Sequence, residues 1–397
     1  MAAEVESKGG FTAFKTPDQC INVFGPHKGA VTCAAFNSKL SVVCCPPAWL
    51  GTCSFTAAEG RYALTGGADG HIRLWNAYRR HLDGSAFLVS DFHLETLRTV
   101  NSVHVQSGNS AFASGGSDRA VTVWDVATGA ATRQFKEHNS FVTCVRWAHT
   151  GQMLWSGSQD KQLRAWDTRA QRGWKPIMQM DFRDSVTCVH ISADGSQVLA
   201  GSADETVRLY DVRGGCVKEV AVGDPVVDVC LGAGGHTMAV FTMGHAAAKR
   251  RPPAWQGGGE PKDPSTQPVT APHKGTVRYL DLDGDCQLGA YTGHTCLSYP
   301  VKGALVAGEA GIISGDEGGA LCMWDVEQGA STGECHRLEV GGVRKDGGGE
   351  VVGAAVPLPR YASHGDRVGV LMPSHAGVAL FLGDAAEADR VQMEEQA

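Results

Sequence analysis

The chain has 397 residues, 51 of them glycine, and a formal net charge of −7 from 35 basic and 42 acidic side chains. A mildly acidic surface gives no general attraction for nucleic acid or anionic membranes. The apolar runs are shorter than the roughly 18 residues that a membrane span needs, and residues 1–19 are polar. These features argue against a membrane protein, and no signal peptide is expected.

Thirteen cysteines occur, and none stands in a Cys-x-x-Cys pair with the matching second pair that zinc requires. Cys33, Cys144 and Cys188 each end the tripeptide Val-Thr-Cys. We expect them to be reduced, apolar core residues. The sequence therefore predicts no metal and no cofactor, and it places the protein in the reducing cytoplasm and nucleus.

In chain order, a polar tail at residues 1–19 precedes a short apolar run, Cys20–Phe24. Short apolar segments separated by glycine-rich turns fill the region 20–384, and this pattern favours many short strands. An acidic tail covers residues 385–397. We therefore expect one domain at 20–384, flanked by two tails.

Three stretches interrupt this pattern. Residues 38–59 carry three cysteines and almost no charge, and Phe87–Leu97 stands where a Gly-His pair is expected. Each is interpreted either as a lineage-specific loop or as retained intron sequence. Residues 245–274 contain several prolines, a glycine run and the cluster Lys249-Arg250-Arg251. Their composition predicts a disordered loop, and the basic cluster is a solvated surface or a nuclear address.

The strand-rich region contains an internal repeat. In its clearest copies an Asp stands six residues before a Trp: Asp69 and Trp75, Asp118 and Trp124, Asp160 and Trp166. Weaker copies end at Tyr210, Leu280, Trp324 and Phe381. Three of the six spacings, of 42, 44 and 44 residues, fall in the period of about 40–45 residues that belongs to a four-stranded propeller blade.

Seven copies of this motif resemble the WD-repeat family. The resemblance implies an all-β fold, a seven-bladed β-propeller in which stacked blades bury each other's faces. The last blade has only three candidate strands, Val351–Pro357, Arg367–Met372 and Val378–Leu382. We predict that Cys20–Phe24 supplies its outer strand and closes the ring.

The resemblance also implies a hydrogen-bond network of His, Ser or Thr, Asp and Trp within a blade. Two blades match it fully, with His27, Thr65, Asp69 and Trp75 in blade one and His138, Ser156, Asp160 and Trp166 in blade three. Blade two lacks the His, blade four has Ala200 and Tyr210, and blade six has its Asp displaced to Asp316. A Ser-His-Asp set can also be catalytic, but its repetition around a ring favours a structural role, and no enzyme activity is expected.

Later blades carry a closer resemblance. Ala200–Arg213 closes blade four on Tyr210, Leu280 ends blade five, and Leu288–His294 precedes the repeat that ends at Trp324. This succession is similar to the mitogen-activated protein kinase organizer family of WD-repeat scaffolds. The resemblance implies kinase-cascade or spliceosomal proteins as partners and a monomeric propeller within larger complexes.

Propellers of this family bind partners mostly on the top face, which consists of the loops before the first strand of each blade, the start of that strand, and the residue before each turn Asp. By the register of the repeat, the candidate protein-binding residues are Thr32, Asn101, Ser117, Phe141, Thr143, Gln159, Ser185 and Thr187. Phe141 is the most attractive anchor, because buried aromatic residues dominate interface energetics.

Two further functions remain open. The segments Trp166–Arg169 and Tyr210–Arg213 end in the motif Asp-x-Arg, which also occurs in substrate receptors of cullin-type ubiquitin ligases. An enzyme with a propeller fold would need an unrepeated cluster of acids or nucleophiles, and none is visible. Direct binding of nucleic acid would need a basic stripe, which the sequence also lacks.

Overall fold

The computed structural model describes residues 19–24, 31–36, 62–80, 86–170, 175–232, 234–245, 273–284, 286–297, 301–306, 309, 311–317, 320–326, 335–339, 356–357, 369–374 and 377–382. Within these ranges the regular elements are β-strands that pair antiparallel in four-stranded sheets. The predicted all-β propeller class is confirmed. None of the described segments is a helix long and apolar enough to cross a membrane.

Consecutive strands form the sheets. Blade one contains β2 (Val31–Phe36), β3 (Tyr62–Gly67), β4 (His71–Arg80) and β5 (Ala86–His93); blade two contains β6 (Val100–Val105), β7 (Ala111–Gly116), β8 (Val121–Asp125) and β9 (Ala131–Phe135); blade three contains β10 (Val142–Trp147), β11 (Met153–Ser158), β12 (Gln162–Asp167) and β13 (Met178–Asp181).

The next sheets follow the same order. Blade four contains β14 (Val186–Ile191), β15 (Gln197–Ser202), β16 (Thr206–Asp211) and β17 (Gly215–Ala221); blade five contains β18 (Val226–Leu231), β19 (Thr237–His245), β20 (His273–Asp281) and β21 (Gln287–Tyr291); blade six contains β22 (Gly303–Val306), β23 (Gly311–Gly315), β24 (Ala320–Asp325) and β25 (His336–Glu339).

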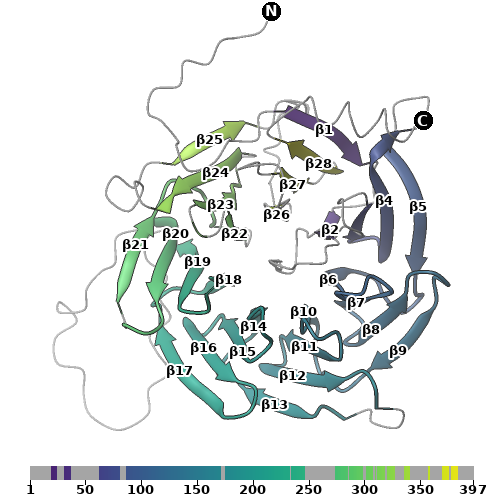
Figure 1. Cartoon of the computed structure of the whole chain (residues 1–397), viewed down its shortest axis with the longest axis horizontal. Coiled ribbons are helices and arrows are strands. Elements are labelled where there is room, and N and C mark those ends of the chain that lie inside the picture. Colours follow the sequence, from purple (N-terminus) through teal and green to yellow (C-terminus); the bar gives the residue numbers. More distant parts are fainter. Residues whose placement is uncertain are drawn as a thin grey trace, which may run out of the picture.

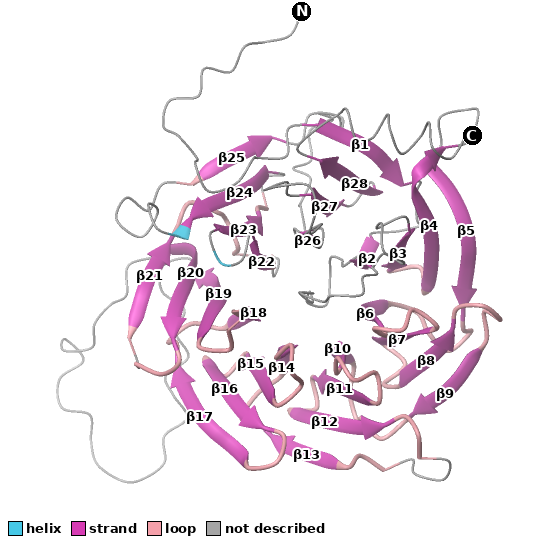
Figure 2. Ribbon diagram, viewed as in Figure 1, coloured by secondary structure: helices cyan, strands magenta, loops and turns pink. Residues whose placement is uncertain are grey.

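The sheets stand side by side around a central axis, with the first strand of each blade innermost and the fourth outermost (Figure 1). Strands are the main elements of the described chain, and turns and loops join them (Figure 2). Because each blade lies between two others, both of its faces are covered, and the large indoles of Trp124, Trp155, Trp166 and Trp324 are buried. Cys144 and Cys188 are free and buried in this core, as predicted.

The repeated Asp shapes the turn between the second and third strands of blades one to four. Its carboxylate accepts a hydrogen bond of 3.1–3.3 Å from the backbone N–H two residues later. The residue in between has a positive φ, and these residues are Gly70, Arg119, Lys161 and Glu205. A short acceptor side chain at this point stabilises the tight turn and explains why Asp recurs there.

A closing sheet combines the two ends of the chain. Its strands are β26 (Val356–Pro357), β27 (Gly369–Ser374), β28 (Gly377–Leu382) and β1 (Gln19–Phe24), and β1 pairs antiparallel with β28. The described strands thus form seven four-stranded sheets. The seven-blade count and the closure through the N-terminal strand stay predictions that can be tested in solution.

Deleting residues 1–24 should lower the melting temperature by at least about 4 °C relative to deleting residues 1–18. Only the longer deletion removes β1 and leaves β28 with an unpaired edge. Differential scanning calorimetry of the two truncated proteins measures the difference. Equal melting temperatures would show that β1 does not close the ring.

Of the three irregular stretches, residues 38–59 lie outside the described residues. The other two have different boundaries or roles from those predicted. Phe87–His93 is part of β5, and Phe92 and Leu97 are buried at 2% exposure, so this stretch completes blade one rather than interrupting the fold. The predicted insertion 245–274 also begins later and ends earlier, because His245 pairs with His273. Pairing with β4 makes the first of these two stretches a strand, and the pairing of His245 with His273 lengthens the two strands that flank the second.

Candidate functional site

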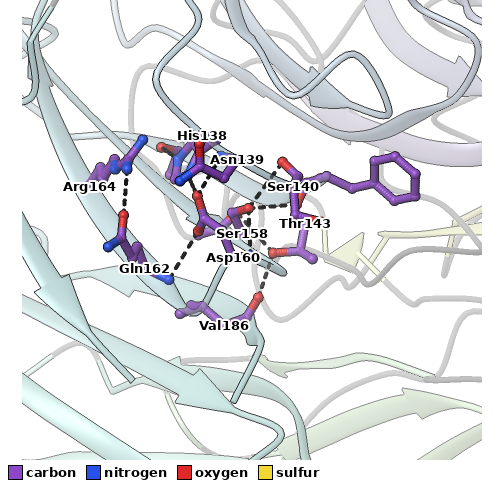
Figure 3. A network of polar contacts seen from close by, with 12 residues as sticks. His138, Asn139, Ser140, Thr143, Ser158, Asp160, Gln162, Arg164 and Val186 are labelled. Atoms are coloured by element: carbon purple, nitrogen blue, oxygen red, sulfur yellow. Dashed lines mark hydrogen bonds and ion pairs between the residues drawn. The ribbon is translucent and has the colours of Figure 1, made fainter. Parts of the chain in front are cut away.

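Blade three contains the complete hydrogen-bond network. The Trp166 indole N–H donates to Ser156 Oγ at 2.8 Å, Ser156 Oγ lies 2.8 Å from His138 Nε2, and His138 Nδ1 lies 2.9 Å from Asp160 Oδ2. The backbone N–H of Asn139 donates to the same carboxylate oxygen at 2.9 Å. Figure 3 shows His138 and Asn139 converging on Asp160. The network therefore joins the loop before β10 to the turn between β11 and β12.

The protonation states of His138 and Asp160 allow each group of the network to donate a hydrogen bond to the next, from Trp166 through Ser156 and His138 to Asp160. Burial lowers the pKa of His138 against the opposing effect of Asp160, so the ring is neutral near pH 7. Nδ1–H then donates to Asp160, while Nε2 accepts from the Ser156 hydroxyl. Burial alone would raise the pKa of Asp160, but the hydrogen bonds from His138 and Asn139 outweigh it and lower that pKa.

This geometry supports a structural role. The side chains of His138 and Asp160 are 0% and 5% exposed, and Ser156 is fully buried. A catalytic serine needs an accessible hydroxyl, whereas this hydroxyl is engaged by both an indole and an imidazole.

Asp160→Ala is expected to lower the free energy of unfolding by about 1–3 kcal/mol, because it leaves the buried His138 ring without its partner. Urea denaturation followed by tryptophan fluorescence measures the loss. Asp118→Ala in blade two is the matched control, since Asp118 makes the same turn contact with Ala120 in a blade where the expected His is absent. Equal losses in the two variants would contradict the importance of the network.

Other blades keep parts of the network. In blade one, Trp75 donates to Thr65 Oγ1 at 2.8 Å, and Asp69 lies 3.0 Å from Arg73, while His27 lies outside the described residues. In blade two, Trp124 donates to Ser114 Oγ at 2.8 Å. Blade four replaces the hydrogen bonds by ring packing, with Tyr210 against Phe182 at 6.3 Å.

Blade six has the histidine but not its partners. His294 is 1% exposed, and within the described part of the chain neither ring nitrogen has a hydrogen-bond partner. Asp316 instead accepts from the backbone N–H of Thr295 at 2.5 Å and binds Arg337, and Trp324 donates to the carbonyl of Thr292. Burial lowers the pKa of His294 to about 4. The displaced Asp therefore leaves a neutral imidazole packed edge-on against Trp324, at 5.4 Å.

Two predicted top-face residues are not on the surface. Asn101 and Thr143 are 3% and 5% exposed. Asn101 Nδ2 donates to the carbonyl of Val142 at 2.8 Å, and Thr143 Oγ1 donates to the carbonyl of Val186 at 2.5 Å (Figure 3). A register shift near the start of each inner strand turns these side chains toward the next blade. The expectation that these two side chains are exposed on the top face is therefore wrong, whereas their contact with a partner stays a prediction.

The remaining predicted residues differ in exposure. Thr187 is half-buried and donates to the carbonyl of Val226 in the next blade at 2.8 Å. Ser117 and Ser185 are half-buried, and Gln159 is exposed. Thr32 lies on β2, but its side chain lies outside the description. None of these polar groups is a strong anchor by itself.

Phe141 is the prominent exposed residue among the predicted set. Its side chain is 45% exposed, and its carbonyl accepts from Gln159 N–H at 3.0 Å and from Ser158 Oγ at 2.9 Å. Sequence reasoning missed its counterpart, Leu297, which is 36% exposed in the loop before β22. Each stands three residues after the histidine of its blade, and this spacing could have revealed the second residue. Blades three and six thus each expose an apolar side chain three residues after their histidine.

The repeats match a known family model. The model of the WD domain, G-beta repeat, matches residues 18–76, 91–125, 129–167 and 174–211. The chain carries WD40 repeats. The third matched segment includes the whole network of blade three, from His138 to Trp166.

Three curated proteins resemble this chain over part of its length, and one of them is named as a WD repeat protein. The chain is 26% identical over 163 residues to the WD repeat domain-containing protein 83 homolog of Dictyostelium discoideum, covering 41% of each protein. It is 31% identical to Protein HIRA of Oryza sativa subsp. japonica over 18% of this chain and 8% of that protein. It is 36% identical to transducin-like enhancer protein 2 of Mus musculus over 17% of this chain and 8% of that protein. The chain thus spans less than half the length of each relative.

WD40 repeat proteins generally act as protein-interaction scaffolds, and they are typically not enzymes. Within the described ranges, His, Cys, Asp and Glu side chains do not gather in groups of three or more that could hold a metal ion. The exposed side chains at the predicted position and its counterpart are those of Phe141, Leu297 and Gln159.

Proposed function

We propose that this chain is a protein-interaction scaffold that binds partners through the top face of its propeller. The observation that carries the proposal is the pair Phe141 and Leu297, two large apolar side chains exposed at the same repeat position in blades three and six. Both side chains follow the histidine of their blade by three residues, so they occupy corresponding positions of the repeat. Aromatic anchors of this kind supply much of the energy of protein interfaces.

The scaffold presents these anchors in fixed positions. The carbonyl of Phe141 is held by Gln159 and Ser158, and the backbone N–H of Leu297 donates to Glu317 at 2.6 Å. A loop that is already ordered loses little entropy when a partner binds. This preorganisation supports a binding surface rather than a pair of incidental apolar residues.

For the partners, we propose kinase-cascade or spliceosomal proteins, met in the cytoplasm and the nucleus. The support is the resemblance of blades four to six to the kinase organizer family. A monomeric propeller that binds neither nucleic acid nor membrane fits the mildly acidic net charge of −7.

Phe141→Ala and Leu297→Ala should each weaken at least one partner interaction about tenfold, which corresponds to the loss of one interface anchor. Val217→Ala is the matched control, because Val217 is 63% exposed but lies on the outer strand β17. Affinity purification from cytosolic and nuclear extracts, with quantitative mass spectrometry, compares the variants after circular dichroism shows equal folding. Equal recovery of every partner by all variants would move binding away from the top face.

A second candidate function is a substrate receptor of a cullin-type ubiquitin ligase. The observation that favours it is the pair Asp167 and Arg169 after β12, in which the guanidinium donates to both carboxylate oxygens at 3.0–3.1 Å. The Arg169 side chain is 64% exposed and can meet a partner. The same purification tests this function: recovery of a ligase adaptor by the wild type and its loss in Arg169→Ala would favour it.

A further inference from the structure

Two histidine rings lie against each other on the two outer strands of blade one. His71 begins β4, His93 ends β5, and the two residues are directly opposite each other in this antiparallel pair. Opposite residues project from the same face of a sheet, and the ring centroids lie 4.4 Å apart with an angle of 12° between the ring planes. Because β5 is the outermost strand of the blade (Figure 1), the histidine pair lies at the rim of the propeller.

Hydrogen bonds fix the position of the hydrogen on both rings. His71 Nδ1 lies 2.9 Å from Asp91 Oδ1, and His93 Nδ1 lies 3.4 Å from the carbonyl oxygen of Gly70. A carboxylate and a carbonyl only accept, so Nδ1 carries the hydrogen in each ring and Nε2 of the neutral ring keeps its lone pair. Among the described residues, neither Nε2 atom takes part in a hydrogen bond.

This arrangement is typical of histidines that bind metals. A ligating histidine usually donates its other ring N–H to a carboxylate or to a backbone carbonyl, which orients the ring toward the metal. His71 has the first kind of partner and His93 the second. The carboxylate of Asp91 is itself held by an ion pair with Arg73 Nε at 3.4 Å. Both rings are therefore oriented by contacts that leave their Nε2 atoms available.

The histidine pair is also open to solvent. The side chains of His71 and Asp91 are 32% and 37% exposed, and His93 is exposed. A hydrated cation can therefore approach the rings without any opening of the blade. The sequence predicts no metal site, because the two histidines belong to no motif and meet only through the pairing of β4 with β5.

We propose that His71 and His93 bind a divalent zinc ion through their Nε2 atoms, with water molecules as its remaining ligands. Imidazole nitrogen is a favoured ligand of zinc, at about 2.0–2.1 Å. Two imidazoles at that distance on a tetrahedral ion have ring centres about 5 Å apart, so the rings need to separate only slightly from 4.4 Å. The bound ion would tie β4 to β5 at the rim of blade one, independently of the top-face residues.

Isothermal titration calorimetry of the full chain with zinc chloride tests the proposal. His71→Gln and His93→Gln should each bind one zinc ion fewer than the wild type, because a single imidazole lacks the second, tethered ligand. Asp91→Asn should keep the site but weaken it about tenfold, since it loses the carboxylate that orients His71. Magnesium chloride should give no binding at the pair, because magnesium prefers oxygen ligands.

His236→Gln is the matched control. His236 Nδ1 also lies beside a carboxylate, that of Asp283 at 2.6 Å, but within the described chain this ring is not stacked on another imidazole. The variant should therefore bind as many zinc ions as the wild type. A zinc stoichiometry and affinity that are the same in the wild type, His71→Gln and His93→Gln would overturn the proposal.

Crystals of the wild type soaked in zinc chloride decide the question if a variant does not fold. An anomalous peak should lie about 2.0–2.1 Å from both Nε2 atoms of the pair. A peak bound to one ring only, or no peak at the pair, would also overturn the proposal. The stacked rings would then contribute only packing between β4 and β5.

Discussion

Asp228→Ala is expected to lower the free energy of unfolding by about 3–5 kcal/mol, the usual effect of breaking a buried ion pair by removing one partner. The reason is that Lys302, 1% exposed and 3.6 Å from the carboxylate, would remain buried without its counter-charge. Urea denaturation at about pH 8 measures the loss under conditions that favour the ionised carboxyl, because the pKa of Asp228 is about 7. Urea also leaves the ionic strength unchanged.

Two variants show whether the lost charge is the cause. Asp283→Ala removes an Asp that pairs with His236 at 2.6 Å but is 72% exposed, and surface pairs contribute little to stability. The double variant Asp228→Leu with Lys302→Met removes both charges and should recover most of the loss. If the double variant is as unstable as Asp228→Ala, the effect comes from packing rather than from charge.

Acidification is expected to destabilise the protein strongly between about pH 6.5 and pH 4. Burial lowers the pKa of four histidines, His104, His138, His190 and His294. The pKa of His190 falls to about 3 and that of His294 to about 4. In the unfolded chain these rings titrate near about pH 6.5. Below that pH the unfolded state binds protons that the folded state excludes, so stability falls as the pH falls.

The magnitude follows from the number of protons. Each histidine contributes about 1.4 kcal/mol per pH unit between its unfolded and folded pKa values. Asp228 acts in the opposite direction, because its raised pKa adds stability at low pH that is lost as the pH rises through about 7. One carboxyl opposes four imidazoles, so we expect a net loss above about 2 kcal/mol between about pH 7 and pH 5.

Urea denaturation at a series of pH values measures this slope. His294→Leu should make the slope shallower by about one proton, because this ring has no hydrogen-bond partner among the described residues. Its removal should also leave stability at neutral pH little changed, since no hydrogen bond is broken. A slope identical to that of the wild type would show that His294 does not stay neutral in the folded protein.

The repeat could be predicted because its signals are local. An Asp six residues before a Trp marks one turn and one strand, and the resemblance to the WD-repeat family indicated the network of His138, Ser156, Asp160 and Trp166. The three atom pairs that this network requires lie 2.8–2.9 Å apart in the structure. The fold class and this network therefore needed no information from distant parts of the chain.

The rest depends on contacts between blades, which repeat register does not reveal. Asn101 and Thr143 occupy positions that the register of the repeat assigns to the surface, but each lies at a bulge that turns its side chain toward the next blade. The pair Asp228 and Lys302 joins two blades, and each residue alone looks like an ordinary surface charge. The state of His294 depends on where Asp316 lies, which the sequence indicated only as a displacement.

The hydrogen bonds between inner strands have a consequence for how such a ring can be rebuilt. Asn101, Thr143 and Thr187 each donate to the first residue of the following inner strand. Blades two, three and four therefore make equivalent hydrogen bonds to the blade that follows. A duplicated copy of blade three would find a matching hydrogen-bond partner on both sides. Blade five has Val227 at that position and relies on Asp228 facing Lys302. A duplicated blade five would set Asp228 against a blade that lacks the lysine, so gene duplication and blade grafting should succeed in the first part of the ring and fail at this contact.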